Sequence, residues 1–319
     1  MSVDAVPFVN CPISMRIAAV VGMTTAAFFA LRLFQFIWLY FLRPPTSFKA
    51  YNAKDGKWAL ITGASKGIGA EFARSLAARG LNVMLVARSK DALQEVASSI
   101  KTKYPKCQTQ IVTADAMAPD AVSIIAKAAK DIDLSILVNN VGVSEDIPAE
   151  LSDTDDGLIR RMIDVNITFT TLLTKALIPQ LKTSGKARSA IINLSSISAL
   201  APISLHGVYA ASKSYINHWS KCLSGELAPY NIDVLSSTPF YVKTDMSGFK
   251  RTSFMVISAK QASEDILNKL GTGCLSITPS FSHSLIAFAF QLLPEDLIAK
   301  VTRQKMLVAR KKLLAKKHK

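Results

Sequence analysis

Cysteine is scarce in this sequence, and its four copies lie far apart. They are Cys11, Cys107, Cys222 and Cys274, and no two of them form a CxxC pair. Disulfide frameworks and zinc sites need cysteines at close or repeated spacings, so we predict no disulfide and no metal site. A reducing compartment fits this cysteine usage.

Charged residues are also few, at 19% of the 319 residues, and the counts of glycine and proline, 14 and 13, are ordinary. Half of the residues are hydrophobic. These proportions exclude a disordered, a collagen-like and a proline-rich chain. The length suits one large α/β domain with appendages, or two small domains.

Acidic residues are fewer than basic ones, which leaves a net charge of +15. Between Lys300 and Lys319 there are nine Lys or Arg and no Asp or Glu. A basic tail without interleaved aromatic residues is typical of a solvated or membrane-surface segment. Recognition of nucleic acid needs charge clustered on a folded face, so no nucleic-acid partner is expected.

One long apolar run lies near the N-terminus, over residues 17–42. Its polar interruptions are Thr24, Thr25, Arg32 and Gln35. As a helix rising about 1.5 Å per residue, the run is longer than the roughly 30 Å hydrocarbon core of a bilayer. A signal peptide would have a shorter apolar stretch and then a cleavage site. We predict a transmembrane anchor, with a helix lying in the membrane interface as the alternative.

The charges around this run predict its orientation. Before the run the basic residue is Arg16, and after it come Arg43, Lys49, Lys54 and Lys57. The positive-inside rule therefore places everything after Arg43 in the cytosol. The final residues, Lys-Lys-His-Lys, fit a dilysine retrieval signal, which a cytosolic receptor reads, or else a plain basic tail. Together these features predict a protein of the endoplasmic reticulum membrane with a single N-terminal anchor and a cytosolic tail.

From residue 57 onward, short apolar strands alternate with helical stretches. Strands are expected at 58–62, 82–87, 110–114, 134–139, 190–194 and 232–236. Helices are expected at 68–79, 91–103, 120–130, 157–181 and 209–227. This alternation predicts a parallel sheet covered on both faces. The expected fold class is a Rossmann-type, doubly wound α/β sheet of about seven strands, with an N-terminal transmembrane helix and a helical, basic C-terminal extension.

The first strand runs into a glycine-rich turn, Thr62-Gly-Ala-Ser-Lys-Gly-Ile-Gly69. Glycine lets the backbone turn sharply and approach a pyrophosphate, and the next helix offers its N–H groups and dipole to the phosphates. The strand-turn-helix context predicts a dinucleotide site. Its expected members in this turn are Gly63, Ser65, Lys66, Gly67, Ile68 and Gly69.

The residue after the second strand predicts which dinucleotide binds. An acid there would hold the ribose 2′-hydroxyl of NAD. This chain has Arg88 instead, and Lys66 lies in the glycine-rich turn. Because a guanidinium can pair with a 2′-phosphate in bidentate geometry, NADPH is the predicted cofactor.

Tyr209 and Lys213 lie at positions i and i+4 of an expected helix, so they share one face. An ammonium close to the phenol is expected to lower the pKa of the phenol from about 10 towards neutrality. Such a tyrosine can give a proton to a carbonyl oxygen while hydride arrives at carbon. Ser196, after the fifth strand, can hold the same oxygen.

These motifs, with the NNxG of residues 139–142, resemble the short-chain dehydrogenase/reductase family over about residues 57–277. The resemblance implies that Ser196, Tyr209 and Lys213 are catalytic, and that Asn166 holds a water in a proton relay. It further implies cofactor contacts at Arg88, Asp115 (adenine), Asn139, Gly142, Tyr209, Lys213, Val242 and Thr244 (nicotinamide carboxamide).

After the sixth strand the chain reads Pro239-Phe-Tyr-Val-Lys-Thr244, where most members have Pro-Gly. This variant and the C-terminal pattern TP…H.L…LPE…RKK resemble the branch of very-long-chain 3-oxoacyl-CoA reductases and 17β-hydroxysteroid dehydrogenases of types 3 and 12. The branch implies NADPH-dependent reduction of long or very long 3-oxoacyl-CoA in fatty acid elongation, with other elongation enzymes as partners. It also implies a homodimer through the helices that carry Asn166 and Tyr209. A 17β-hydroxysteroid or other sterol keto-reductase, and a catalytically idle membrane scaffold, remain alternatives.

Three parts of the chain are expected. Residues 1–50 carry the anchor, residues 51–277 form the catalytic domain, and residues 278–319 form a membrane-associated, basic extension. The apolar stretch 277–293 is interrupted by Pro279, His283 and Gln291, so we expect it to lie in the interface or to cover the acyl channel rather than to span the bilayer.

Overall fold

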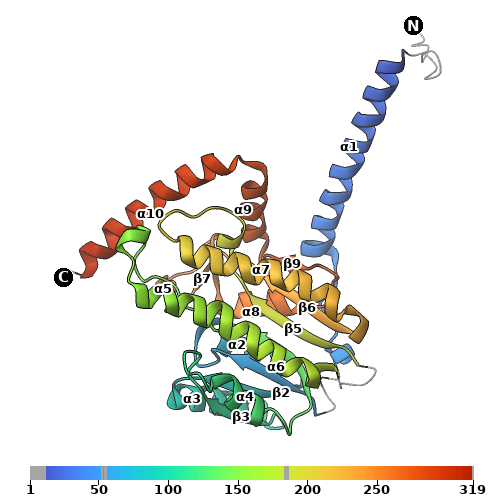
Figure 1. The fold of residues 1–319 in the computed structure, drawn as a ribbon. Helices are drawn as coiled ribbons and strands as arrows, with labels where there is room; N and C mark the ends of the chain where they lie inside the picture. The colour runs from blue at the N-terminus through green and yellow to red at the C-terminus, as the bar shows by residue number, and fades with distance from the viewer. Residues whose placement is uncertain (1–11, 52, 54–55, 183–186, 318–319) are drawn as a thin grey trace. The chain divides into compact units, whose positions relative to one another are not determined.

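The computed structural model of the chain describes residues 12–51, 53, 56–182 and 187–317 (Figure 1). The chain divides into two compact units, Met1–Pro45 and Thr46–Lys319. The first contains the apolar helix, and the second contains the sheet and the C-terminal helices.

Helix α1 runs from Ile13 to Ile37 and continues into a π-helical turn, Trp38–Leu42. It begins directly after Pro12, whose fixed φ suits the start of a helix, and therefore starts earlier than residue 17. The span of 30 residues reaches a mean hydropathy of 1.9, and none of that stretch is buried. Within the described residues it is the one helix long and apolar enough to cross a membrane, by length and composition alone.

A seven-stranded sheet forms the centre of the second unit, and all of its strands are parallel. The strands are β1 (Trp58–Thr62), β2 (Asn82–Ala87), β3 (Thr109–Thr113), β4 (Leu134–Asn139), β5 (Ser189–Leu194), β6 (Ile232–Ser237) and β9 (Ser276–Ile277). Their order across the sheet is β3-β2-β1-β4-β5-β6-β9. The predicted doubly wound fold is confirmed. The order reverses between β1 and β4, which is where such folds bind dinucleotides.

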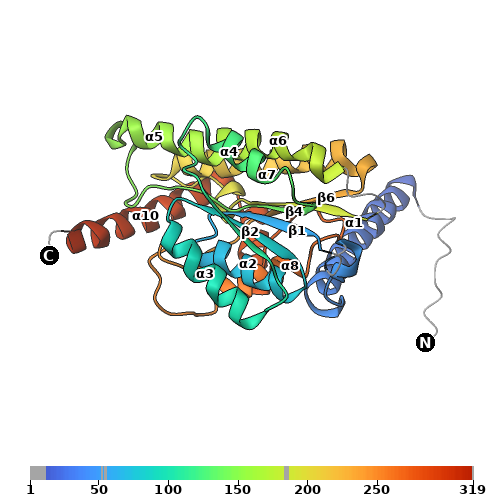
Figure 2. The ribbon, with the colours of Figure 1, turned by 90° about the horizontal axis from the view of Figure 1, so that it is seen from below.

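Helices cover both faces of this sheet (Figure 2). One face carries α2 (Gly67–Ala78), α3 (Lys90–Lys103) and α8 (Ala259–Leu267). The other carries α4 (Ala121–Ala128), α5 (Asp156–Ile163), α6 (Thr170–Lys182) and α7 (Gly207–Leu227). A π-helical turn, η5 (Asp164–Phe169), joins α5 to α6, so the expected single helix 157–181 contains an irregular turn.

The core lies between the sheet and these helices. Leu60 in β1, Leu137 in β4 and Ile191 in β5 have no exposed surface, and they belong to one cluster with Leu173 and Leu177 of α6. Strands that are apolar along their whole length are required by a sheet covered on both faces. Truncation of one such leucine to alanine costs about 2–5 kcal/mol.

Helices α9 (Phe281–Leu292) and α10 (Glu295–Lys317) form the predicted C-terminal extension and belong to the second unit. Helix α10 is fixed by Ile298, which is 3% exposed, and by Thr302, whose hydroxyl donates to the Pro202 carbonyl oxygen over 3.1 Å. Helix α9 has 12 residues, fewer than the roughly 17–25 that a membrane span needs. It is therefore too short to cross a bilayer.

Candidate functional site

The glycine-rich turn between β1 and α2 is closed tightly on itself. Gly63 and Gly67 have φ angles of +65° and +59°, a conformation that favours glycine. A Cβ atom on Gly69 would fall against the carbonyl oxygen of Gly63. Because α2 begins at Gly67, its first N–H groups lie at this turn. The sequence-predicted turn thus forms a backbone cradle suited to phosphate.

Asn140 fixes this turn from the neighbouring strand end. Its side-chain Nδ2 donates to the carbonyl oxygens of Thr62 and Gly63, over 3.0 and 3.2 Å. Its backbone N–H donates to the Thr62 hydroxyl over 3.0 Å. Asn140 therefore ties the end of β4 to the turn after β1, at the carboxyl ends of the strands where the order reverses and where such folds have their dinucleotide-binding crevice.

The side chain of Asn139 points elsewhere, although the sequence pattern singled this residue out for the cofactor. It is 4% exposed, and its Nδ2 donates to Thr174 Oγ1 and Asn193 Oδ1, both over 2.8 Å. These bonds hold β4 to β5 and α6 inside the fold. Successive side chains at the end of a strand point to opposite sides, and this alternation is the signal that would have identified Asn140.

Three predicted cofactor residues lie exposed around the rim of the crevice. Arg88 follows β2, Asp115 follows β3, and Lys66 stands in the glycine-rich turn. Lys66 Nζ is 3.2 Å from Asp245 Oδ2, with both side chains about 70% exposed. Such an exposed ion pair contributes little free energy, so Lys66 can exchange Asp245 for a phosphate at small cost.

Val242 and Thr244 bring the segment after β6 onto the glycine-rich turn. Val242 lies in the short strand β7 (Tyr241–Lys243), which pairs in parallel with β8 (Val256–Ser258) in a sheet of its own. Val242 is buried, and Ile68 packs against its cluster. A Cβ atom on Gly67 would lie 3.2 Å from Thr244 Cγ2. The predicted carboxamide-binding residue therefore lies against the predicted phosphate-binding turn.

Ser196 and Tyr209 are brought together as the sequence predicts. Ser196 follows β5 and caps a short 3-10 turn, where its Oγ accepts from the Ser198 N–H over 3.2 Å. Tyr209 lies in the first turn of α7, close enough to Ser196 for the serine to lower the pKa of its phenol. A hydroxyl pair at the carboxyl edge of the sheet can bind one carbonyl oxygen from two directions.

The expected lowering of the Tyr209 pKa is wrong for the protein without ligand. Burial raises the pKa of Tyr209 to about 12; the nearby Ser196 opposes this rise and the charge of Glu145 adds to it. Lys213 lies on the same helix face, but its Nζ is 5.7 Å from the centre of the Tyr209 ring. The phenol therefore remains protonated at neutral pH, as a proton donor must.

Lys213 is buried beside the crevice, with 5% of its surface exposed. Its Nζ donates to the Leu194 carbonyl oxygen over 2.9 Å, at the end of β5. Burial lowers the pKa of Lys213 to about 8. A Cβ atom on Gly142 would lie 3.1 Å from this Nζ. The ammonium therefore fits here because residue 142 has no side chain.

Asn166 lies in the π-helical turn η5 and is 1% exposed. Its Oδ1 accepts from the Val143 N–H over 2.8 Å, and its Nδ2 donates to the Val143 carbonyl oxygen over 2.9 Å. Nδ2 also approaches Ser212 Oγ at 2.9 Å. The carboxamide thus joins the loop after β4 to α7, and its role in a proton relay stays a prediction.

His283 of α9 has a role in the structure that the sequence pattern did not assign. Its Nδ1 accepts from the Phe240 N–H, and its Nε2 approaches the Met255 carbonyl oxygen, both over 3.2 Å. Burial lowers the pKa of His283 to about 4, so the imidazole is neutral. The ring of Phe240 packs edge-on against it, which explains how a bulky residue is accommodated after Pro239.

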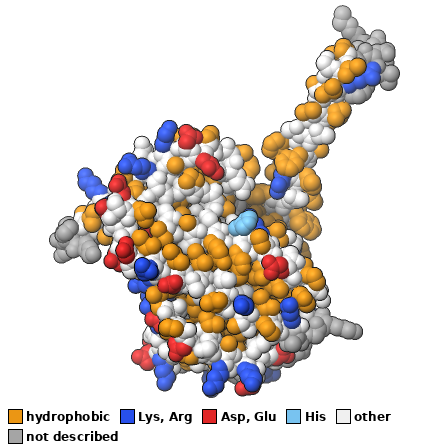
Figure 3. All heavy atoms as spheres, viewed as in Figure 1, with side chains coloured by type: hydrophobic (Ala, Val, Ile, Leu, Met, Phe, Trp, Pro, Cys, Tyr) orange, Lys and Arg blue, Asp and Glu red, His pale blue; other side chains and the backbone are white. Residues whose placement is uncertain are grey.

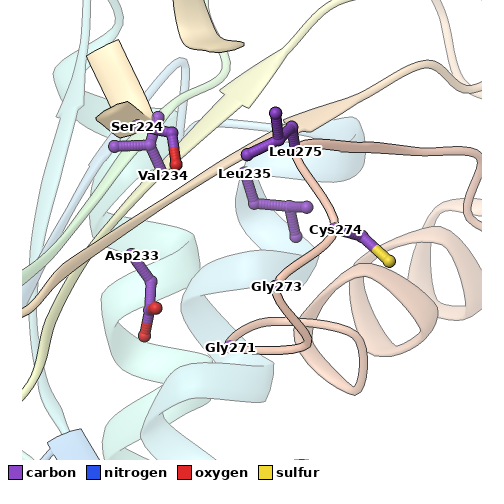
Figure 4. Close-up of a pocket in the computed structure, with 8 residues that line it drawn as sticks. All are labelled: Ser224, Asp233, Val234, Leu235, Gly271, Gly273, Cys274 and Leu275. Carbon is purple, nitrogen blue, oxygen red and sulfur yellow. The ribbon is translucent and has the colours of Figure 1, made fainter. Parts of the chain in front are cut away.

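A small cavity lies at the opposite, amino-terminal edge of the sheet (Figure 4). It is lined by the start of β6, including Asp233, and by the loop that leads to β9. Its volume of about 40 Å³ suits a few water molecules and no dinucleotide. Asp233 accepts from the Tyr51 hydroxyl over 2.7 Å and pairs with Arg188 at 3.1 Å. These contacts are structural and stand apart from the crevice.

The residues of the crevice fit a dinucleotide. Two glycines with positive φ and a helix N-terminus form a cradle that side chains would fill. Exposed Lys66 and Arg88 supply positive charge at its rim, and the paired hydroxyls of Ser196 and Tyr209 lie at the carboxyl edge of the sheet. This donor set suits an anionic cofactor and a carbonyl group.

Comparisons with known proteins agree with this geometry. The family model for short chain dehydrogenases matches residues 57–253. A very-long-chain 3-oxoacyl-CoA reductase from Debaryomyces hansenii is 36% identical over 264 residues, which are 79% of this chain and 76% of that protein.

Solved structures share the fold. A short-chain dehydrogenase from Sphingobium yanoikuyae in complex with NADPH has a TM-score of 0.65 and 27% identity, covering 74% of this chain and 92% of its own. A 3-ketoacyl-(acyl-carrier-protein) reductase from Brucella melitensis complexed with NADH has a TM-score of 0.61 and 27% identity, covering 70% and 95%. With the matched family model, these similarities show that the chain belongs to the short-chain dehydrogenase family, as an oxidoreductase that acts on a carbonyl or hydroxyl group with a nicotinamide cofactor.

Proposed function

We propose that this chain reduces long or very long 3-oxoacyl-CoA to 3-hydroxyacyl-CoA with NADPH, as a step of fatty acid elongation. The observation that carries the chemistry is the closeness of Ser196 and Tyr209, by which the serine lowers the pKa of the phenol, beside the buried Lys213. The substrate class is supported by relatives named very-long-chain 3-oxoacyl-CoA reductase, which match most of this chain at 32–36% identity.

Each residue of the site has a defined task in this proposal. Tyr209, protonated at neutral pH, gives its phenolic proton to the oxygen of the 3-oxo group, which Ser196 holds by a hydrogen bond. When bound, the nicotinamide supplies the hydride that reaches the carbonyl carbon. Lys213 binds the ribose of the cofactor, and Asn166 holds the water through which Tyr209 recovers its proton.

The cofactor residues divide by the part of NADPH that they contact. The turn from Gly63 to Gly69 binds the pyrophosphate, and Arg88 with Lys66 binds the 2′-phosphate. Asp115 contacts the adenine, and Thr244 contacts the carboxamide. Asn139 acts through the backbone, because its side chain is engaged within the sheet.

The loop between β7 and β8 suits a substrate with an acyl chain and a charged head. Met246 and Phe254 are 65% and 66% exposed, and Lys250 and Arg251 are exposed between them. Apolar side chains that lie open to water serve an acyl chain, while the two cations suit the phosphates of CoA. Ordinary surface charges are the alternative for Lys250 and Arg251, and their removal should then leave the KM for acyl-CoA unchanged.

The membrane of the endoplasmic reticulum is the proposed location, with the catalytic unit and the tail in the cytosol. Besides α1, helix α9 presents an exposed apolar stripe at helical spacing, formed by Phe281, Leu285, Phe288 and Leu292. Helix α10 follows with a basic, acid-poor end. This combination suits a bilayer surface carrying anionic lipids.

A homodimer is proposed through the helices that carry Asn166 and Tyr209. Hydrophobic side chains gather on the face of the molecule that displays α5 and α7 (Figure 3). Ile163 of α5, Leu172 of α6 and Tyr215 of α7 are 43%, 46% and 38% exposed. Other enzymes of fatty acid elongation are proposed as partners from the relatives' function alone.

The test is the oxidation of NADPH by the full chain in detergent, with 3-oxoacyl-CoAs of graded length and a 17-ketosteroid side by side. Faster turnover of the acyl-CoAs is expected, with Tyr209→Phe as the inactive control. Preference for the ketosteroid would replace this proposal by the sterol reductase. Tight NADPH binding without turnover of any carbonyl would favour the idle scaffold.

A further inference from the structure

A buried carboxylate and an imidazole lie next to Tyr209 and have no part in the chemistry above. Glu145 stands in the loop after β4, with its side chain 5% exposed. His206 directly precedes α7, and its Nδ1 is 2.9 Å from Glu145 Oε2. The distance is that of an ion pair, but the angles are not those of an aligned hydrogen bond.

His206 packs against Tyr209, and Glu145 acts on it through its charge. The ring of His206 lies against the ring of Tyr209, with centroids 4.7 Å apart and planes inclined by 49°. The carboxylate of Glu145 lies close enough to the first turn of α7 for its charge to act on Tyr209.

The backbone around the pair is held in place as well. Leu205, next to His206, has a φ of +61°, which is costly for a residue with a side chain. Its carbonyl oxygen accepts from the Ala149 N–H over 3.0 Å, in the same loop as Glu145. The loop after β4 therefore contacts the segment before α7 at two points, through the Ala149–Leu205 backbone bond and through Glu145 and His206.

We propose that Glu145 and His206 are a positioning pair that orients the phenol of Tyr209 for proton donation and sets the pH range over which it donates. The inference rests on Tyr209 being the acid of the proposed function. It does not depend on which carbonyl compound is the substrate.

The charges around the phenol give the direction of the effect. The groups that face Tyr209 are Ser196 from the turn after β5, Glu145 from the loop after β4, and His206 and Lys213 from α7 and its approach. The negative charge of Glu145 raises the pKa of Tyr209. Removing that charge should therefore let the phenol lose its proton at lower pH.

The charge of Glu145 is itself maintained by its neighbours. Burial raises the pKa of Glu145, but the contact with His206 and the N–H groups of Glu145 and Tyr209 outweigh burial, so the net pKa is lowered. His206 carries charge only when its imidazole is protonated. The pair thus joins a buried carboxylate to an imidazole.

The test compares Glu145→Gln with Asp146→Asn, which removes an exposed carboxylate one residue away. In Glu145→Gln the alkaline limb of the kcat profile should move down by about half a pH unit or more, and kcat at pH 7 should fall several-fold. The Kd for NADPH should change less than about twofold, since the cofactor cradle is untouched. Asp146→Asn should match the wild type.

A second variant separates position from charge. His206→Phe keeps a ring against Tyr209 and does not remove the Glu145 carboxylate, which is ionised at the high pH of the alkaline limb, so kcat should fall without the downward shift of that limb. If Glu145→Gln lowers kcat by the same factor at every pH, or lowers only the melting temperature, the pH profile is unchanged. The pair is then merely structural and the inference is overturned.

Ionisation of the phenol can also be followed without any substrate. Ultraviolet absorbance of tyrosinate, taken as the difference between each protein and its Tyr209→Phe counterpart, should show earlier ionisation in Glu145→Gln. A chain that reduced no carbonyl would overturn the proposed function, yet this titration would still decide the inference. Equal titration of Tyr209 in both backgrounds would count against it.

Discussion

The ammonium of Lys213 occupies the space beside Gly142, where a Cβ atom would lie 3.1 Å from its Nζ and 3.4 Å from Asn166 Oδ1. Gly142→Ala should therefore displace groups of the site while leaving the fold intact. We expect kcat to fall by about 10- to 100-fold, since small misplacements of catalytic groups have large effects. Gly225→Ala is the control, because nothing lies within 4 Å of its Cβ position in α7. Equal kcat in the two variants would show that an alanine side chain fits at position 142 without displacing Lys213 or Asn166.

Tyr209→Phe removes the phenolic oxygen and keeps the ring. Reduction should be lost by at least about 100-fold, in the range that a positioned acid contributes, while the Kd for NADPH, measured by fluorescence, stays nearly unchanged. A variant that kept most of its kcat would remove Tyr209 from the role of acid.

Arg88→Asp removes the proposed partner of the 2′-phosphate and adds an acceptor for a free ribose hydroxyl. The ratio of kcat/KM for NADPH over NADH should fall by about 10- to 100-fold, which is the worth of a hydrogen bond to a charged group. Lys90→Asp, at the start of α3 nearby, serves as the control for added negative charge. An unchanged ratio in Arg88→Asp would mean that the phosphate is bound elsewhere.

His283 makes the free energy of unfolding depend on pH in the mildly acidic range. Its pKa is about 4 in the folded state and near 6.5 when unfolded, so its contribution is present above pH 6.5 and is lost as the pH falls towards 4. The advantage of the wild type over His283→Leu in free energy of unfolding should shrink by about 3 kcal/mol from pH 7 to pH 4. Denaturant titrations in detergent at both pH values measure this. A constant difference would show that His283 is accessible to protons in the fold.

The orientation of the chain in the membrane can be tested at its C-terminus. An N-glycosylation acceptor site added after Lys319 should stay unmodified in microsomes, because α9 is too short to carry the tail across. The same site added before Ser2 is the positive control for luminal exposure. Efficient glycosylation at the C-terminal site would contradict both the proposed cytosolic tail and the predicted retrieval signal.

The sequence alone predicted the strands of the sheet, but it did not predict the contacts between residues that are distant along the chain. Continuous apolar runs such as Leu134–Asn139 and Asn82–Ala87 predicted their strands to the residue, because burial on both faces leaves a simple pattern. The glycine-rich turn and the Ser196–Tyr209 pair were also found, since each motif follows directly from a strand or helix position.

What the sequence could not supply depends on residues distant along the chain. The engagement of Asn139 with Thr174 and Asn193 is set by packing of β4 against β5 and α6. The pKa of Tyr209 follows from burial, which a spacing of four residues does not report. The contact of Glu145 with His206 joins two loops 61 positions apart, and no local motif marks either residue.

The apolar stripe of α9 has a practical consequence for handling the protein. Removing the chain before Thr46 would take away α1 and keep the second unit, in which the Thr46 hydroxyl bonds the carbonyl oxygens of Asn268 and Leu270. Phe288 and Leu292 would still be 54% and 62% exposed in such a fragment. Truncation should therefore not yield a freely dispersed enzyme: detergent or lipid nanodiscs should be needed throughout purification, even without α1.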